Sequence, residues 1–280
     1  MLRYRLFLCC FFFLTGSLEA QPPLHVFYTS DLNGVLKSDF PDLRGDILRV
    51  GAAMNDVRTR ESLRSDQYLL LDTGDALGFH YYSQLDSGRV MAEKMIEAGY
   101  DGMVAGNLDF LYGLDNLYKI SALDSNFSIL AANLTWKKDT SAFPAFRIYE
   151  RQGLRIGVIG LVEEELIEKV KAYRLENLVE ISPVVKTLTN NIRELRDRTD
   201  LLIAVSHLDM YENLQVCRKV PGLDLVISKS SQDSLQALQV YDKRSRRMTT
   251  IVEAPGFARR IGHLEIRWER TADGVRITEM

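Results

Sequence analysis

The sequence is poor in cysteine, and this scarcity limits how the fold can be held together. The cysteines are Cys9, Cys10 and Cys217 in a chain of 280 residues, and the first two lie in an apolar N-terminal run. If that run is removed, Cys217 has no partner and an intramolecular disulfide is excluded. We therefore expect the fold to rest on a buried core, which a chain of this length is large enough to form.

The chain also lacks a strong charge of either sign, with a formal net charge of −3 at pH 7. Binding to the phosphate backbone of nucleic acid requires a clustered excess of Lys and Arg, and so does attraction to an anionic membrane surface. The composition therefore argues against a nucleic-acid partner and against a polybasic membrane patch. It leaves any protein partner unknown.

No apolar run is long enough to cross a bilayer, but a shorter one opens the chain. Arg3 and Arg5 precede the run 6–14, and small and polar residues then lead to Ala20. Charged, apolar and small-residue regions in this order are typical of a secretory signal peptide, whereas a membrane span needs about 20 apolar residues. We predict that residues 1–20 are cleaved and that the remaining chain is periplasmic or extracellular, without a stable membrane anchor. An uncleaved anchor is the alternative.

No internal repeat, low-complexity tract or Pro/Gly-rich linker divides the chain, so we predict one domain from residue 21 to 280. Within it, short continuous apolar runs alternate with longer amphipathic segments. Continuous runs are typical of strands buried on both faces. The expected strands are 24–29, 67–72, 102–105, 128–132, 155–161, 201–206 and 223–228. The expected helices are 47–64, 87–98, 114–122 and 183–198.

Alternation of strands and helices indicates an α/β layered domain in which helices cover the sheet. The end of the chain differs, because residues 248–253, 262–269 and 275–280 form a β-rich finish without helices. We also interpret one histidine of the first expected strand and one of the segment 262–269 structurally. We interpret His25 as a strand-edge residue and His263 as a surface group.

Polar residues follow several expected strands at the point where each strand ends. Asp31 follows the first strand, Asp72 and Asp75 the second, Asn107 the third and His207 the sixth. In open α/β sheets, ligand-binding groups gather beyond the carboxyl ends of the strands. Asp, Asn and His are common ligands of divalent metals, so together these residues favour a metal site. Taken singly, each Asp or Asn is equally well explained as a turn residue.

Short motifs occur in a fixed order along the predicted domain. Residues 29–34 are similar to an Asp-x-His-Gly block, residues 106–110 to a Gly-Asn-His-Glu-Phe-Asp block, and residues 205–208 to a Leu-Ser-His block. Further similar blocks lie at 71–75, 156–161, 221–227 and 254–266. In this order the chain resembles the N-terminal domain of calcineurin-like metallophosphoesterases of the 5'-nucleotidase family. The resemblance implies a four-layer α/β/β/α sandwich.

The resemblance also implies a pair of divalent metals bridged by Asp75. The family's ligand types are retained at Asp31, Asp75, Asn107 and His207. Family histidines are replaced at Asn33, Ser230 and Gln232. The block that in the family reads Gly-Gly-His-x-His is Ser-Lys-Ser-Ser-Gln at 228–232, which brings Lys229 to the predicted metal site.

The family's catalytic histidine and the Asp that orients it are absent as well. Leu108 and Leu111 occupy their positions. Loss of a positioned acid or base costs about 10²- to 10⁴-fold in rate. Loss of the metals costs more, because metals generate hydroxide near neutral pH and neutralise phosphate charge. The sequence therefore predicts impaired catalysis and leaves open whether the chain is an enzyme.

The replacements suggest two alternatives for the altered site. Oxygen donors from Asp31, Asn33, Asp75 and Gln232 suit a hard cation such as Mg²⁺, Mn²⁺ or Ca²⁺ better than a zinc pair. Alternatively, the polar residues hydrogen-bond to one another, Lys229 repels cations, and no metal binds.

These alternatives leave three functions open. The first is an exported, weakly active or non-catalytic binding protein. The second is a phosphoester hydrolase that uses a single remaining metal on a nucleotide or another small phosphoester. The third is a structural or interaction protein that uses only its surface. For the first two functions, the expected ligand is a small phosphorylated molecule.

Overall fold

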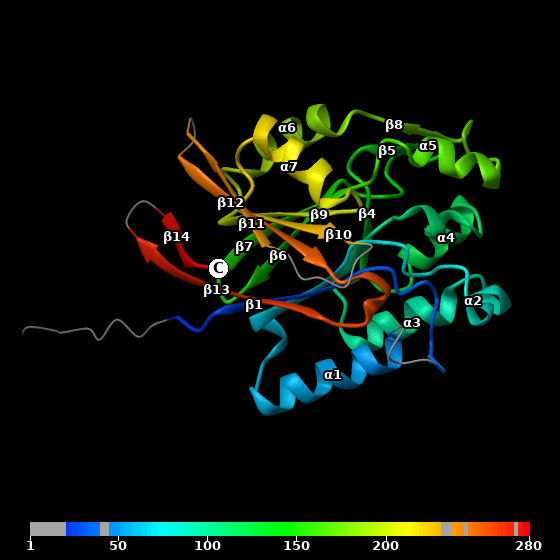
Figure 1. Cartoon of the computed structure of the whole chain (residues 1–280), viewed down its shortest axis with the longest axis horizontal. Helices are drawn as coiled ribbons and strands as arrows, with labels where there is room; N and C mark the ends of the chain where they lie inside the picture. The colour runs from blue at the N-terminus through cyan, green and yellow to red at the C-terminus, as the bar shows by residue number, and fades with distance from the viewer. Residues whose placement is uncertain (1–20, 40–44, 231–236, 244–245, 272–273) are drawn as a thin grey trace, which may run out of the picture.

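Figure 1 shows the computed structural model, which describes residues 21–39, 45–230, 237–243, 246–271 and 274–280. These residues form two six-stranded sheets and a separate two-stranded sheet. The predicted signal peptide, residues 1–20, lies outside the described residues. Within the described part of the chain, no helix is both long and apolar enough to span a bilayer.

The first sheet combines parallel strands from the N-terminal half with an antiparallel C-terminal hairpin. Its order is β14 (Gly274–Glu279), β13 (Gly262–Thr271), β1 (Leu24–Thr29), β2 (Tyr68–Asp72), β3 (Gly102–Val104) and β4 (Ser128–Leu130). Strands β1 to β4 pair in parallel, whereas β13 pairs antiparallel to β1. The closing segment of the chain is therefore hydrogen-bonded to its opening strand.

The second sheet has a parallel centre with antiparallel edges. Its order is β11 (Ala237–Asp242), β12 (Arg247–Ala254), β10 (Leu225–Lys229), β9 (Leu201–Ser206), β7 (Leu154–Leu161) and β6 (Phe146–Arg151). The small sheet pairs β5 (Leu134–Trp136) with β8 (Val179–Ile181).

Helices cover the outer face of each large sheet, as Figure 1 shows. Helices α1 (Ile47–Arg60) and α3 (Arg89–Ala98) lie against the first sheet, and α6 (Val184–Leu195) and α7 (Met210–Lys219) against the second. The shorter helices are α2 (Tyr81–Asp86), α4 (Leu114–Ser121) and α5 (Leu166–Lys169). The 3₁₀ turns are η1 (Ser65–Gln67), η2 (Asn107–Phe110), η3 (Val170–Tyr173) and η4 (Gly256–Ala258). The predicted α/β/β/α sandwich of one domain is confirmed.

The buried strands explain why their sequences are continuously apolar. In β9, Leu201, Ile203 and Val205 belong to the core between the two sheets. Leu202 and Ala204, which alternate with them, belong to a second core under α6 and α7. Because successive side chains of a strand point to opposite faces, both sets must be apolar when both faces are covered.

The sequence patterns left some elements unpredicted. Helix α7 was missed, although Asp209 caps its first turn by accepting a hydrogen bond from the Glu212 N–H. Strand β6 was missed because most of its side chains are not fully buried. Helix α1 ends at Arg60, earlier than the expected 64. Cys217 lies buried in α7.

Candidate functional site

The loops after the parallel strands meet at one end of the two sheets. Asp31 follows β1, Asp75 follows β2 and Asn107 follows β3, while His207 follows β9 in the facing sheet. Asp75 and His207 come into contact across the sheets, with 3.6 Å between Oδ2 of Asp75 and Nε2 of His207. The structure therefore brings the predicted strand-end residues together at this edge.

The first two loops are joined by backbone hydrogen bonds in an unusual conformation. Asp31, Asn33 and Asp75 have φ values of 56°, 53° and 56°, in the left-handed region that few non-glycine residues adopt. The Asp31 N–H donates to the Gly74 carbonyl at 3.2 Å, and the Asn33 N–H donates to the Asp75 carbonyl at 2.8 Å. Such backbone strain is concentrated at functional sites, and these bonds hold the acidic residues in a fixed arrangement.

Asp109 fastens the second loop to the third. Its carboxylate accepts the N–H groups of Asp75 at 2.9 Å, Leu77 at 2.8 Å and Gly106 at 2.7 Å. The side chain is buried, and burial raises its pKa to about 8, with a further rise from the charge of Asp75, whereas the N–H donors oppose the shift. Asp109 touches no ligand position itself, so it is a positioning residue for Asp75.

His207 is enclosed by these loops and fixed in one orientation. Its ring is fully buried, and Nδ1 lies 2.7 Å from the Thr73 carbonyl. Because a carbonyl only accepts, Nδ1 must carry the proton, and Nε2 of the neutral ring keeps its lone pair. A Cβ added at Gly74 would lie 2.8 Å from Nδ1, and one added at Gly106 would lie 2.7 Å from Cε1. Glycine at these positions lets the loops close around the ring.

Lys229 donates a hydrogen bond to Nε2 of His207. Its Nζ lies 3.2 Å from Nε2 of His207, at the end of β10. The same ammonium lies 3.9 Å from Oε2 of Glu163, whose other oxygen binds Lys169 Nζ at 2.6 Å. An ammonium has donors and no acceptor, so Lys229 donates to the nitrogen that a metal would otherwise take.

The electrostatics of Asp31 reflect the same cluster. Burial raises the pKa of Asp31, the hydrogen bond from the Ser30 hydroxyl lowers it, and the charge of Asp75 raises it. His207 and Lys229 act on Asp31 in the opposite direction and favour the ionised form. Lys229 is therefore close enough to Asp31 to balance part of its charge.

The replaced positions form hydrogen bonds of their own. The Asn33 amide donates to the Asp31 carbonyl at 2.6 Å, and the Ser230 hydroxyl is hydrogen-bonded to the Glu253 carboxylate. The Asn107 side chain is hydrogen-bonded to the Tyr173 hydroxyl, and burial raises the pKa of this tyrosine. Gln232 lies outside the described residues.

The positions that the resemblance assigns to the catalytic histidine and its Asp are apolar and half-buried. Leu108 follows Asn107 directly, and its backbone N–H donates to Oδ1 of Asp75 at 2.8 Å, so its backbone still supports the site. The side chains of Leu108 and Leu111 carry no proton donor or acceptor. This part of the site is therefore built for packing and for backbone support.

Several known proteins are similar to this chain in sequence or in fold. A 5'-nucleotidase of Vibrio vulnificus is 28% identical over 195 residues, covering 64% of this chain and 35% of the relative. A probable 5'-nucleotidase of Treponema pallidum is 26% identical over 253 residues, covering 82% of this chain and 41% of the relative. A calcineurin-like phosphoesterase of Bacillus subtilis has a solved structure with a TM-score of 0.73 and 18% identity, covering 92% of this chain and 89% of its own. In sequence the chain is similar to part of these 5'-nucleotidases, and its fold is that of a calcineurin-like phosphoesterase.

No family model matches the sequence, so the likeness to 5'-nucleotidases rests on these individual relatives. The chain spans 35% and 41% of the lengths of the two curated relatives. The likeness to the Bacillus phosphoesterase concerns the fold. What the longer 5'-nucleotidases act on is therefore a matter of proposal for this chain.

The residues present do not fit the metal pair that the family implies. Lys229 donates to Nε2 of His207, and the ammonium carries a positive charge where a second positive charge would have to enter. Asn33 turns its amide N–H₂ toward the chain, and Ser230 is bound to Glu253. Asn33, Ser230 and Gln232 thus stand where the resemblance implies histidines, and Lys229 adds a positive charge beside His207.

The motif blocks do not indicate several contacts that shape this site. The Thr73 carbonyl orients His207, while Glu163 and Glu253 hold Lys229 and Ser230. Asp109 does lie in a motif block, at the position of the family's Glu, and its three N–H contacts identify its role. The other contacts join residues far apart in sequence, so local patterns do not indicate them.

Proposed function

We propose that this protein is an exported member of the 5'-nucleotidase family whose dinuclear metal site is degraded, and that it binds ligands rather than hydrolysing them. The observation that carries the proposal is the 3.2 Å contact between Nζ of Lys229 and Nε2 of His207. The ammonium uses the lone pair of a retained ligand, and it repels a divalent ion at Asp75.

The apolar side chains at the catalytic positions support the same conclusion. Leu108 and Leu111 stand where the family resemblance places the histidine and its Asp, and neither side chain can exchange a proton. A retuned hydrolase would need at least one part of this machinery, either the metals or the proton donor. Here both parts are altered.

A small phosphorylated molecule is the ligand that we propose for the altered site. The side chain of Lys229 is 23% exposed, so it is partly accessible from solvent. A phosphate oxygen would accept hydrogen bonds from it, because charge-assisted bonds to phosphate are among the stronger ones. The export that we propose follows from the N-terminal pattern of residues 1–20.

A single-metal phosphoester hydrolase is the second candidate. It is favoured by the 3.6 Å separation of Oδ2 of Asp75 and Nε2 of His207, which is close to the spacing of two ligands on one ion. For that function Lys229 has to move away from His207. The two candidates therefore differ in whether the chain binds a metal at Asp75.

Calorimetric titration separates the candidates. We expect no heat from Mg²⁺, Mn²⁺ or Ca²⁺ beyond that of an Asp75→Ala variant, since Lys229 repels the cation. We expect heat from AMP or inorganic phosphate that weakens at least about tenfold in Lys229→Ala, because a charge-assisted bond is lost. Metal binding that disappears in Asp75→Ala would establish the hydrolase instead. If neither metal nor phosphate binds, the protein acts only through its surface.

A further inference from the structure

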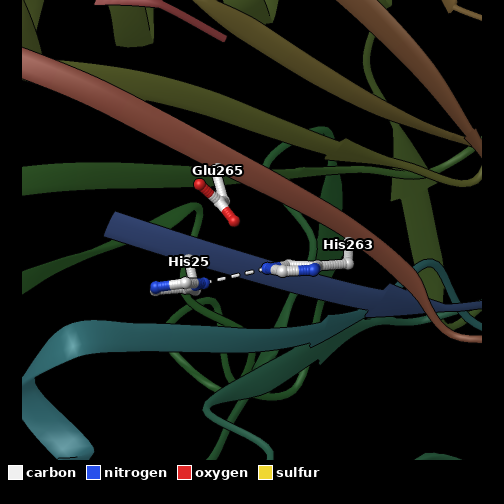
Figure 2. Close-up of side chains that lie close together, drawn as sticks. All are labelled: His25, His263 and Glu265. Atoms are coloured by element: carbon white, nitrogen blue, oxygen red, sulfur yellow. Dashed lines mark hydrogen bonds between the residues drawn. The ribbon is translucent and has the colours of Figure 1, made fainter. Parts of the chain in front are cut away.

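A second group of potential metal ligands lies on the first sheet, toward the opposite end of β1 from Asp31. The pairing of β1 with β13 places His25 opposite Glu265 and Phe27 opposite His263. Because alternate residues of a strand share a face, His25, His263 and Glu265 project from the same side of the sheet. Figure 2 shows the two imidazole rings directed toward one another, with the Glu265 carboxylate beside them.

The interpretation of His25 as a strand-edge residue is wrong. Strand β1 lies inside the sheet, between β13 and β2, and His25 is 6% exposed. His263 lies on the exposed side, in agreement with its interpretation as a surface group, and its ring stacks on Phe27 with the centroids 4.4 Å apart. Phe27 also lies parallel to His25, so one aromatic ring helps to align both imidazoles.

The spacing of these side chains is close to that of metal ligands. Nδ1 of His25 lies 2.9 Å from Nε2 of His263, and one ligand atom from each of the three residues lies within 4.8 Å of the others. Two nitrogens bound to a tetrahedral ion at about 2.0–2.1 Å are roughly 3.3 Å apart. The imidazoles therefore need only a small rotation, and the longer reach to Glu265 is covered by the free rotation of an exposed side chain.

The hydrogen bond between the rings also identifies the donor chemistry. Between two imidazole nitrogens, one donates a proton and the other accepts it, and a change of tautomer makes both nitrogens acceptors. A metal ion then replaces the shared proton. Two imidazole nitrogens and one carboxylate form a ligand set that suits zinc and other late divalent transition metals better than Mg²⁺ or Ca²⁺.

We propose that His25, His263 and Glu265 form a site for a divalent transition-metal ion, such as Zn²⁺, separate from the site at Asp75 and His207. Along β1, His25 and Asp31 are roughly 20 Å apart at about 3.3 Å per residue. His263 and Glu265 are exposed, so solvent completes the coordination of the ion. The ion clips β13 to β1, which joins the C-terminal segment to the start of the domain.

One existing contact competes with this metal site. Oε2 of Glu265 is 3.3 Å from Nη2 of Arg267, but both side chains are about half exposed, at 45% and 54%. Exposed ion pairs contribute little to stability, so turning Glu265 toward the imidazoles costs little. Glu61 adds a further negative charge near His263, and this charge favours a cation at the same place.

Zinc competition titration of the full chain against a chromophoric chelator tests this site, independently of the proposed function. The His263→Gln variant should bind one equivalent of Zn²⁺ fewer than the wild type. Glu265→Gln should lower the Zn²⁺ affinity of this site by at least about tenfold, because an uncharged amide oxygen replaces the charged carboxylate. Asp75→Ala should retain the equivalent. Co²⁺ bound to the wild type should show visible d–d bands that are lost in His263→Gln.

His263 and Glu265 are exposed, so these variants are expected to fold, and circular dichroism confirms this for each one. The proposal is overturned if the wild type binds no Zn²⁺, or if His263→Gln binds as many equivalents as the wild type. It is also overturned if the equivalent disappears in Asp75→Ala, because the ion would then belong to the family site. A substitution at Lys229 changes binding at the Asp75–His207 site and leaves Zn²⁺ binding at His25, His263 and Glu265 unchanged. Failure of one proposal can therefore be told apart from failure of the other.

Discussion

Replacing Asp109 with alanine is expected to lower the free energy of unfolding by about 3 to 6 kcal/mol. The carboxylate accepts the N–H groups of Asp75, Leu77 and Gly106, and all these bonds are buried. A buried donor that loses its acceptor costs about 1–3 kcal/mol. With alanine at this position the three N–H groups lose their acceptor. The loop that carries Asp75 also loses its attachment to the third loop.

Urea unfolding of the purified chain measures this loss. Asp109→Asn should fall between the wild type and Asp109→Ala, because one amide oxygen remains but the N–H₂ group faces a donor. Asp115→Ala is a matched control, since Asp115 is exposed and, among the described residues, its ion pair is with Lys138 on the surface. The control should stay within about 0.5 kcal/mol of the wild type. An Asp109→Ala variant as stable as this control would contradict the positioning role.

Replacing Lys229 with glycine, the residue of the family block at this position, is expected to increase the affinity of the site for Mn²⁺ or Zn²⁺ by at least about 100-fold. The change removes the donor that occupies Nε2 of His207. It also removes a repulsion of several kcal/mol, since unit charges about 4 Å apart interact by about 4 kcal/mol at an effective dielectric constant of 20, and a divalent ion doubles this. Asp75 and His207 are then free to bind an ion.

Lys169→Ala is the control for Lys229→Gly. Lys169 also contacts Glu163, at 2.6 Å, but it makes no contact with His207 among the described residues. The control removes a lysine of the same cluster and should leave metal affinity within about threefold of the wild type. The comparison is made in a His263→Gln background, so that only the family site is measured. Equal affinities in both variants would show that Lys229 does not block the site.

Local patterns in the sequence predicted the sandwich because its strands are buried on both faces. Leu201 to Ser206 forms a strand with the predicted bounds, and Leu24 to Thr29 does so as well. The approach of Asp75 to His207 was also predictable, because strand ends of parallel sheets collect ligand groups and the motif order indicates the family. Helix α7 was missed although Asp209 and Glu212 form a capping box at its start, which is a recognisable sequence signal.

The direction of a side chain is set by distant parts of the chain and was not predictable. The sequence placed Lys229 near the site, but its contact with Nε2 depends on the Thr73 carbonyl, which fixes the His207 ring from another sheet. His25 and His263 are 238 residues apart, and only the pairing of the first strand with a C-terminal strand brings them together. Local periodicity carries no information on such a pairing.

Hydrolysis of an aryl phosphate and of AMP tests the degraded site most directly. The purified chain is assayed with Mg²⁺, Mn²⁺, Ca²⁺ or Zn²⁺ and with EDTA, beside an Asp75→Ala control. A site in which Lys229 takes the place of metal and Leu108 that of the catalytic histidine should give no turnover above the control. Metal-dependent turnover that is abolished by EDTA and by Asp75→Ala would contradict this and establish the chain as a working phosphohydrolase.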